Sequence, residues 1–169
     1  MIMQSLVIYD SKFGNTERIA DAIARGLGTL GSVLVMDTAE ASGTRRAQAE
    51  PLDLVLLGGP TQRRAPSPAL RSFVDALPAD LRRVPAATFD TRYRGSTWIM
   101  GSAAAEAAKV LRKEGSKVVA PPESFFIGRG GPLERQTLEP GEIERAEAWG
   151  RAVGASVLTS RPHSEGPES

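Results

Sequence analysis

Short, mostly apolar runs recur along the chain and predict strands. The first run, Leu6–Tyr9, has no polar position among its apolar residues, which is typical of a strand buried on both faces of a sheet. We expect five strands, at Leu6–Tyr9, Ser32–Met36, Leu52–Leu57, Val84–Phe89 and, as one strand in two parts, Lys117–Ala120 with Phe125–Ile127. The sequence Gly58-Gly59-Pro60 predicts a sharp end to the third strand.

Between these strands, apolar residues recur every three or four positions, which predicts amphipathic helices. In the helix expected over Thr16–Leu27 the apolar residues share one face, and Asn15 or Thr16 is suited to cap its start. Further helices are expected after Pro68 through Leu77, over Ile99–Lys113 and over Gly141–Leu158. Residues 39–50 are small, polar and charged, which predicts a loop or a weak helix.

The alternation of strands and helices predicts the fold class. Strands joined through helices pair in parallel with right-handed crossovers, so we expect a single doubly wound, five-stranded parallel α/β sheet with helices on both faces. A chain of 169 residues suits one domain, which we place at residues 1–159. Residues 160–169 are rich in Pro, Ser, Glu and Gly, which predicts a disordered tail.

Composition narrows the chemistry that this domain performs. The chain has no cysteine, and its one histidine, His163, lies in the predicted tail, which argues against iron–sulfur, zinc–thiolate and Ser-His-Asp sites. Redox chemistry would therefore need a bound organic cofactor. The net charge of +1 gives no reason to expect a nucleic-acid partner. The N-terminus is typical of a strand rather than a signal peptide, and no apolar run is long enough for membrane insertion, so we expect a cytoplasmic protein.

The segment after the first strand carries the first candidate site. In a doubly wound sheet, ligands bind beyond the carboxyl ends of the strands, where the strand order reverses. This segment leads into a helix N-terminus, where free N–H groups and the helix dipole favour an anion, and Gly14 allows close backbone approach. The pattern fits a phosphate-binding loop and also a plain helix cap. The candidate residues are Ser11, Lys12, Phe13, Gly14, Asn15 and Thr16.

Two other strand ends carry unusual segments. Residues 58–68 form a Gly- and Pro-rich loop that is long for a strand-to-helix turn. Residues 89–98 include Tyr93 and Trp98, which would either stack on a planar ligand or simply cover the sheet edge. The candidate residues in these segments are Pro60, Thr61, Gln62, Arg63, Asp90, Thr91, Arg92, Tyr93 and Gly95.

The run from Gly26 to Gly31 matches the dinucleotide-binding pattern GxGxxG in the wrong context. It follows a predicted helix and precedes a predicted strand, which is the reverse of the order that dinucleotide binding needs. We interpret it as a helix end followed by a turn.

Three of these segments resemble the flavodoxin family, and the resemblance extends over about residues 4–158. Ser11-x-x-Gly14-Asn15-Thr16 is similar to the family's phosphate loop after the first strand. Gly58-Gly59-Pro60-Thr61 is similar to its loop after the third strand, and Asp90-x-x-Tyr93 to its loop after the fourth. The resemblance implies the strand order 2-1-3-4-5 and a bound flavin mononucleotide (FMN).

The resemblance also implies roles for the candidate residues. The first loop would hold the phosphate, Thr61 and Gln62 would lie near the edge of the flavin ring, and Tyr93 would stack on it. Asp90 and Thr91 would bond the ring or set the loop. We assign no catalytic acid, base or nucleophile, because an electron carrier needs none.

Charge is where the chain departs from the family. Flavodoxins are acidic, whereas Arg63, Arg64, Arg92 and Arg94 surround the predicted site here. These arginines would favour an anionic reduced flavin, bind an anionic substrate, or lie on the solvated surface. Gln62 stands where the family often has an aromatic residue over the inner face of the flavin.

The resemblance implies an FMN-binding redox protein that transfers electrons to a redox partner protein or a small-molecule acceptor. An alternative is an FMN-dependent quinone or protoporphyrinogen oxidoreductase of the same fold, and a third is a binding module that has lost the flavin. We expect a monomer or a homodimer.

Overall fold

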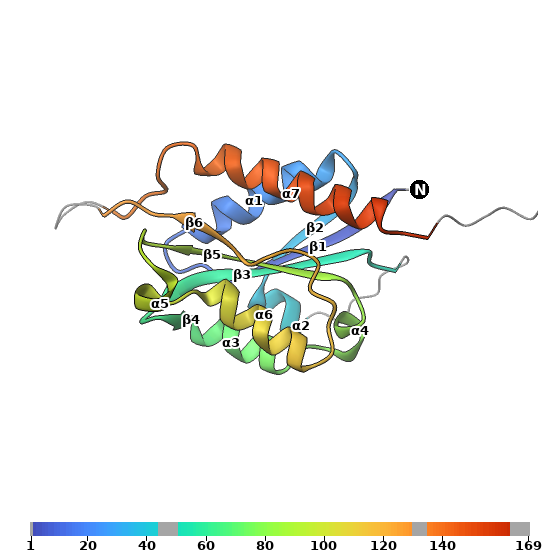
Figure 1. Cartoon of the computed structure of the whole chain (residues 1–169), viewed down its shortest axis with the longest axis horizontal. Coiled ribbons are helices and arrows are strands. Elements are labelled where there is room, and N and C mark those ends of the chain that lie inside the picture. Colours follow the sequence, from blue (N-terminus) through green and yellow to red (C-terminus); the bar gives the residue numbers. More distant parts are fainter. Residues whose placement is uncertain (1, 44–50, 130–134, 163–169) are drawn as a thin grey trace, which may run out of the picture.

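The computed structural model describes residues 2–43, 51–129 and 135–162. Within them, one sheet lies between two layers of helices (Figure 1). Five parallel strands lie in the order β2 (Gly31–Asp37), β1 (Met3–Tyr9), β3 (Leu54–Gln62), β5 (Ala86–Arg92) and β6 (Glu123–Phe126). A short strand that was not predicted, β4 (Ala65–Pro66), pairs antiparallel with β3. The predicted fold class is confirmed. If the five parallel strands are numbered along the chain without β4, their order in the sheet is 2-1-3-4-5.

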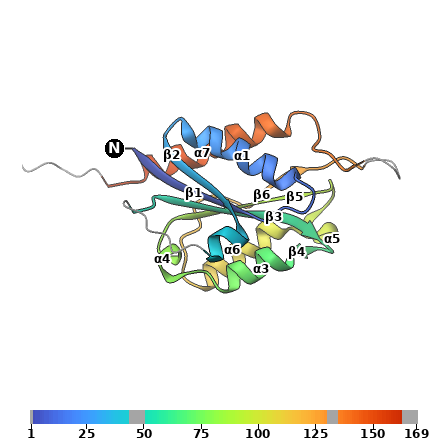
Figure 2. The same ribbon diagram turned by 180° about the vertical axis from the view of Figure 1, so that it is seen from behind.

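Helices cover both faces of the sheet, as Figures 1 and 2 show from opposite sides. One face carries α1 (Asn15–Gly28) and α7 (Glu142–Thr159). The other carries α2 (Thr38–Gly43), α3 (Pro68–Asp75), α4 (Ala79–Arg82) and α6 (Ala103–Lys113), while α5 (Thr97–Met100) lies beyond the carboxyl end of β5. No helix among the described residues is long and apolar enough to cross a membrane.

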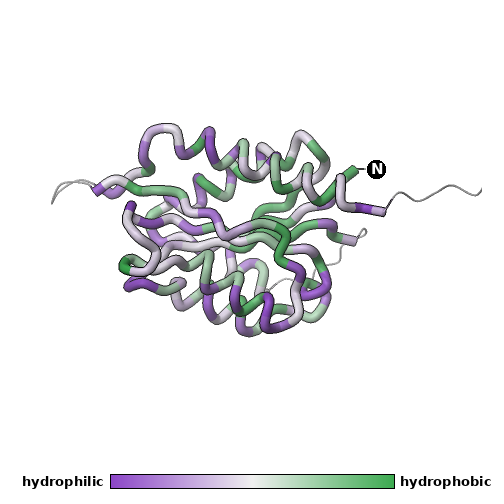
Figure 3. Tube along the Cα trace, in the orientation of Figure 1, coloured by the Kyte–Doolittle hydropathy of each residue, from purple (hydrophilic) through white to green (hydrophobic). Residues whose placement is uncertain are grey.

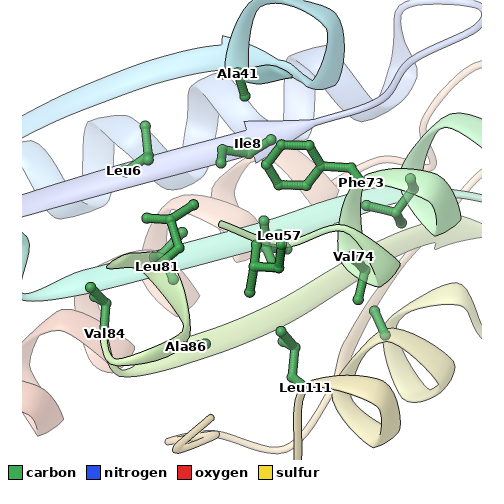
Figure 4. Packing of buried hydrophobic residues seen from close by; sticks show 14 of the residues in the cluster. Leu6, Ile8, Ala41, Leu57, Phe73, Val74, Leu81, Val84, Ala86 and Leu111 are labelled. Atoms are coloured by element: carbon green, nitrogen blue, oxygen red, sulfur yellow. The ribbon is translucent and has the colours of Figure 1, made fainter. Parts of the chain in front are cut away.

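Two apolar cores, one on each face, explain why the strands carry continuous apolar runs. Successive strand residues point to opposite faces. Leu6, Ile8 and Leu57 therefore pack in the core beneath α3 and α6, shown in Figure 4, while Val7 and Leu56 pack beneath α1 and α7. The outer helices alternate hydrophilic and hydrophobic positions, as Figure 3 shows, because each has one face in a core and one in solvent.

The predicted ends of two strands are wrong, and packing explains both. β3 continues through Gly58-Gly59-Pro60 to Gln62. A Cβ on Gly58 would lie 2.3 Å from the Phe89 ring, so the glycine lets the strand pass close to its neighbour instead of ending it. Pro60 lies past the end of β1, at an edge position that tolerates proline. β5 runs to Arg92 and pairs there with β6, so residues 90–92 belong to a strand and not to a loop.

Other predicted elements are shorter than expected. The helix predicted over Ile99–Lys113 is split, because Gly101 has a φ of +71° and the Ser102 hydroxyl then caps α6 by accepting the N–H of Ala105. Residues 117–120 form only an isolated bridge, between Val118 and Ala86. α3 ends at Asp75. Of the predicted loop or weak helix, residues 44–50 lie outside the described residues, as do 163–169 of the predicted tail.

Glycines allow α1 and α7 to pack with their backbones in contact. A Cβ on Gly26 would lie 2.0 Å from the Glu147 carbonyl oxygen, and one on Gly150 would lie 2.5 Å from the Ile23 carbonyl oxygen. Gly26 belongs to the GxGxxG match, which the structure confirms as a helix end and turn, since α1 ends at Gly28 and β2 begins at Gly31. This contact fixes the position of α1 over the sheet.

Glu142 connects the start of α7 to β6. Its carboxylate accepts the backbone N–H of Phe126 at 2.7 Å and the guanidinium of Arg145 at 2.6 Å. Arg145 also pairs with Glu123 at 2.7 Å. Burial opposes ionisation of Glu142, but the hydrogen bonds from Arg145 and Phe126 outweigh it and lower its pKa below the ordinary value.

Replacing Gly26 tests the helix contact. We expect Gly26→Ala to destabilise the protein by about 2 kcal/mol or more, because its methyl group meets backbone that cannot move away. Gly28→Ala is the matched control in the same helix, since a Cβ there meets nothing within 4 Å; it should be neutral or stabilising by up to about 1 kcal/mol. Urea unfolding of both variants measures the difference, and equal effects would contradict the proposed contact.

The ion pair of Glu142 predicts a pH dependence. A carboxyl with a lowered pKa stabilises the folded state above its unfolded value, 4.5, and this contribution is lost as the pH falls through the folded pKa. We expect Glu142→Gln to cost about 1–3 kcal/mol at pH 7, and the difference from wild type to shrink below pH ~4.5. Urea unfolding across this range measures it, with Glu144→Gln as an exposed control in the same turn. A pH-independent difference would refute this assignment.

Candidate functional site

A shallow groove with a volume of about 90 Å³ opens at the carboxyl ends of β1, β3 and β5. We call it the strand-end groove. It is lined by Ser11, Lys12, Phe13, Asn15, Thr16, Pro60, Thr61, Gln62, Thr91, Tyr93, Ile127 and Gln136. The structure thus brings together most of the residues that the three segments suggested, from positions far apart in the sequence.

The N-terminus of α1 faces this groove without a side-chain cap. Its N-cap residue is Gly14, with a φ of +89°, and not Asn15 or Thr16 as predicted. The first helical hydrogen bond runs from the N–H of Arg18 to the carbonyl of Gly14, so the N–H groups of the first turn have no acceptor within the helix. These N–H groups and the positive end of the helix dipole suit an anion.

The side chains expected to cap α1 bond elsewhere. The Asn15 amide donates to the Gln136 carbonyl oxygen at 3.0 Å, and the Thr16 and Thr91 hydroxyls lie 2.8 Å apart. The Ser11 hydroxyl accepts the N–H of Gly14 at 3.1 Å, which holds the loop in its turn. The loop is therefore preformed, and the start of the helix stays available to a ligand.

Asp90 lies behind the groove rather than in it. Its side chain is fully buried, and one carboxylate oxygen accepts hydrogen bonds from the hydroxyls of Thr61 at 3.1 Å and Ser102 at 2.6 Å. The Thr61 hydroxyl donates its hydrogen to Asp90 and also accepts the N–H of Ala103 at 2.9 Å, so both its donor and an acceptor site are engaged within the protein. Asp90 therefore holds the loop in its conformation, which is one of the two roles considered for it. Thr61 lines the groove, but its hydroxyl points away from the groove toward Asp90.

Arg92 and Gly95 also lie outside the groove lining and shape the turn after β5. The buried Arg92 guanidinium donates to the carbonyls of Tyr93 at 3.2 Å and Gly95 at 2.9 Å, and to the Ser124 hydroxyl at 2.9 Å. Its Nε lies 4.0 Å from the second Asp90 oxygen. These bonds hold Tyr93, whose half-buried ring lines the groove.

The predicted basic rim is only partly formed. Arg94 pairs with Glu139 at 2.7 Å and lies over the Phe126 ring, and Arg64 donates to the carbonyl of Trp98 at 3.0 Å. Neither lines the groove, and Arg63 does not line it either. A cation that the sequence analysis did not single out, Arg129, has its guanidinium 5.5 Å from the centre of the Tyr93 ring.

Sequence reasoning missed two groove residues, Ile127 and Gln136. Ile127 was assigned only to a strand, and no pattern marked Gln136. The contact between Asn15 and Gln136 spans 121 positions, and no local signal in the sequence reports such a contact.

The groove suits a ligand that is anionic at one end and flat at the other. The uncapped helix start and Lys12 lie along it with the ring of Tyr93 and the apolar side chains of Pro60 and Ile127. Among the described residues, no group of three or more His, Asp or Glu side chains is placed to hold a metal ion. The donor set therefore fits a phosphate and an aromatic ring.

Solved structures share this fold. A flavodoxin from the domain Archaea gives a TM-score of 0.69 at 18% identity, over 92% of this chain and 99% of that one. Flavodoxin 1 from Bacillus cereus gives 0.67 at 22% identity, over 94% of this chain and 99% of that one. The flavodiiron protein from Giardia intestinalis gives 0.68 at 17% identity over 92% of this chain, which spans only 36% of that protein.

Comparison with curated proteins finds no match. The family model of the flavodoxin domain matches residues 6–120, which is more than half of the chain and includes all three of the segments singled out above. From this match, and from the fold that supports it, this chain belongs to the flavodoxin family.

Proposed function

We propose that this chain binds FMN in the strand-end groove and transfers electrons through it. Members of the flavodoxin family bind a flavin, usually FMN. The observation that carries the proposal is the start of α1, which has no side-chain cap and whose residues line the groove. An uncapped helix start beside an open groove favours a phosphate, which FMN has and riboflavin lacks.

The two ends of FMN have counterparts in the groove. The first-turn N–H groups of α1, with Lys12, would hold the phosphate. Tyr93 would stack on the ring, while Pro60 and Ile127 would exclude water from it. A bound flavin supplies the electron transfer, and the protein contributes binding, orientation and electrostatics.

Electron transfer fits the groove better than catalysis on a substrate. Among the described residues that line it, there is no carboxylate and no histidine, the side chains most used to move protons. Asp90, the carboxylate carried by β5, is buried and already accepts three hydrogen bonds.

Asn15→Asp tests the phosphate assignment. The new carboxylate adds a negative charge at the start of α1, where it repels a phosphate, and it removes the amide that donates to the Gln136 carbonyl. Loss of that loop contact alone would weaken both flavins, whereas charge repulsion weakens only FMN. We expect FMN to bind about tenfold more weakly, and riboflavin to bind within about twofold of wild type. Titration of the FMN-free protein with each flavin, followed by visible absorption and fluorescence, measures both affinities.

Ala69→Asp is the matched control, because it adds the same charge at an exposed position of the first turn of α3, outside the groove. It should leave both affinities unchanged. A protein that takes up no FMN would refute the proposal, and so would an equal loss of FMN and riboflavin binding in Asn15→Asp. Steady turnover of NAD(P)H with a quinone would favour the oxidoreductase alternative.

A further inference from the structure

Four exposed residues beside the strand-end groove form a surface that the groove does not use. Trp98 and Ile99 of α5 are 84% and 59% exposed, and α5 buries none of its residues. Arg63 and Arg64, at the turn between β3 and β4, are also exposed. Both views show α5 beside β4 at the same end of the molecule (Figures 1 and 2). We call these four residues the basic-apolar patch.

The backbone of the patch is held in place by its neighbours. The Arg64 guanidinium donates to the carbonyl of Trp98, and the Ser96 hydroxyl accepts the N–H of Trp98 at 3.3 Å. Gly101 packs directly on Arg64, since a Cβ there would lie 2.2 Å from the Arg64 carbonyl oxygen. The Trp98 and Ile99 side chains are therefore presented on a supported turn, which reduces the entropy lost when a partner binds.

The arginines occupy positions that do not favour arginine. Gln62 pairs with Ala65, so Arg63 and Arg64 form a two-residue turn, and both have positive φ, +46° and +71°. Turns of this kind favour Asn-Gly, because a side chain is strained in the left-handed region. Strained residues of this type cluster at functional sites, which suggests a role for the two side chains.

The charge of the patch is not balanced locally. Among the described residues, no carboxylate lies within ion-pair distance of Arg63 or Arg64, whereas Arg94 is paired with Glu139. Exposed tryptophan and arginine together are the residues most enriched where proteins bind one another. The patch is therefore complementary to a partner surface that has an apolar centre surrounded by acidic residues.

We propose that the basic-apolar patch docks an acidic redox protein, which exchanges electrons with the flavin. The proposal rests on the proposed function. The patch adjoins the groove on two sides, because β3 carries Thr61 and Gln62 and α5 follows Tyr93. A partner seated on Trp98, with its own acidic residues over Arg63 and Arg64, would thus lie next to the groove, and opposite charges would speed the encounter.

A small rigid patch suits a protein better than a lipid surface. Stable attachment to an anionic membrane needs a larger apolar face or a cluster of four to eight basic residues. Here two apolar side chains project beside two arginines. Such a surface is sufficient for the small, transient interfaces that are typical of electron-transfer proteins.

The soluble haem domain of cytochrome b5, an acidic one-electron acceptor, serves as the probe, with basic cytochrome c for comparison. Reduced FMN-loaded protein is mixed with each oxidised cytochrome, and one electron passes to the haem iron. We expect the rate with cytochrome b5 to fall about threefold or more between 20 and 200 mM salt. Arg63→Asp and Trp98→Ala should each lower the rate with cytochrome b5 about fivefold at low salt. Aspartate is chosen at position 63 because it tolerates a positive φ. Calorimetric binding of cytochrome b5 to the protein as purified tests docking without electron transfer.

Lys109→Glu is the control, an equal charge reversal at an exposed position of α6. It should leave the rate with cytochrome b5 unchanged, and cytochrome c should not be slowed by Arg63→Asp. Binding of cytochrome b5 without electron transfer would support docking while refuting the proposed function. The docking proposal would be overturned if both patch variants bound cytochrome b5 as tightly as wild type does. It would also be overturned if Arg63→Asp lost its FMN. The same holds if the wild-type protein associated with itself or bound vesicles and Trp98→Ala did not.

Discussion

The buried carboxylate of Asp90 joins the segments that form one side of the site. It accepts hydrogen bonds from the end of β3, through Thr61, and from the start of α6, through Ser102 and the N–H of Ala104 at 3.0 Å. An unpaired charge in this position would cost several kcal/mol, so these donors must remain in place. The turn that follows β5 depends on the same cluster, because Arg92 lies beside Asp90 and binds the turn carbonyls.

The other side of the site depends on the position of α1. Backbone contact with α7 at Gly26 and Gly150 fixes the helix over the sheet, and Gly14 turns the chain so that the helix begins at the groove. The helix start is stable without a side-chain cap because the loop bonds to itself and to Gln136. An anion that binds there would complete the interactions of the first turn.

The four arginines expected around the site have two different environments in the structure. Arg92 and Arg94 are engaged by carbonyls, by Glu139 and by the ring of Phe126, so they act within the structure. Arg63 and Arg64 remain on the surface beside Trp98. Of these four arginines, Arg63 and Arg64 are therefore the two whose charge is open to a partner, where charge selects partners more than it stabilises the fold.

The sequence alone determined the parallel sheet and most of the groove, whereas the strand order came from the resemblance to the flavodoxin family. Apolar runs, helical periodicity and turn residues are local signals, and the strand ends that carried motifs do meet at one edge. It determined element ends less well, since Gly58 and Gly59 favour a turn locally but pack in a strand against Phe89 and Leu70. Pro60 is tolerated in the same strand because it lies past the end of β1.

Only the tertiary structure decided which candidate side chains face the groove. Asp90 and Arg92 have the chemistry of ligand-binding residues, yet they bond inward because neighbouring elements supply their partners. Gln136 reaches the site only because the chain after β6 returns to Asn15. Such contacts join residues distant in sequence, and they form only once the sheet and helices have packed, so no local pattern encodes them.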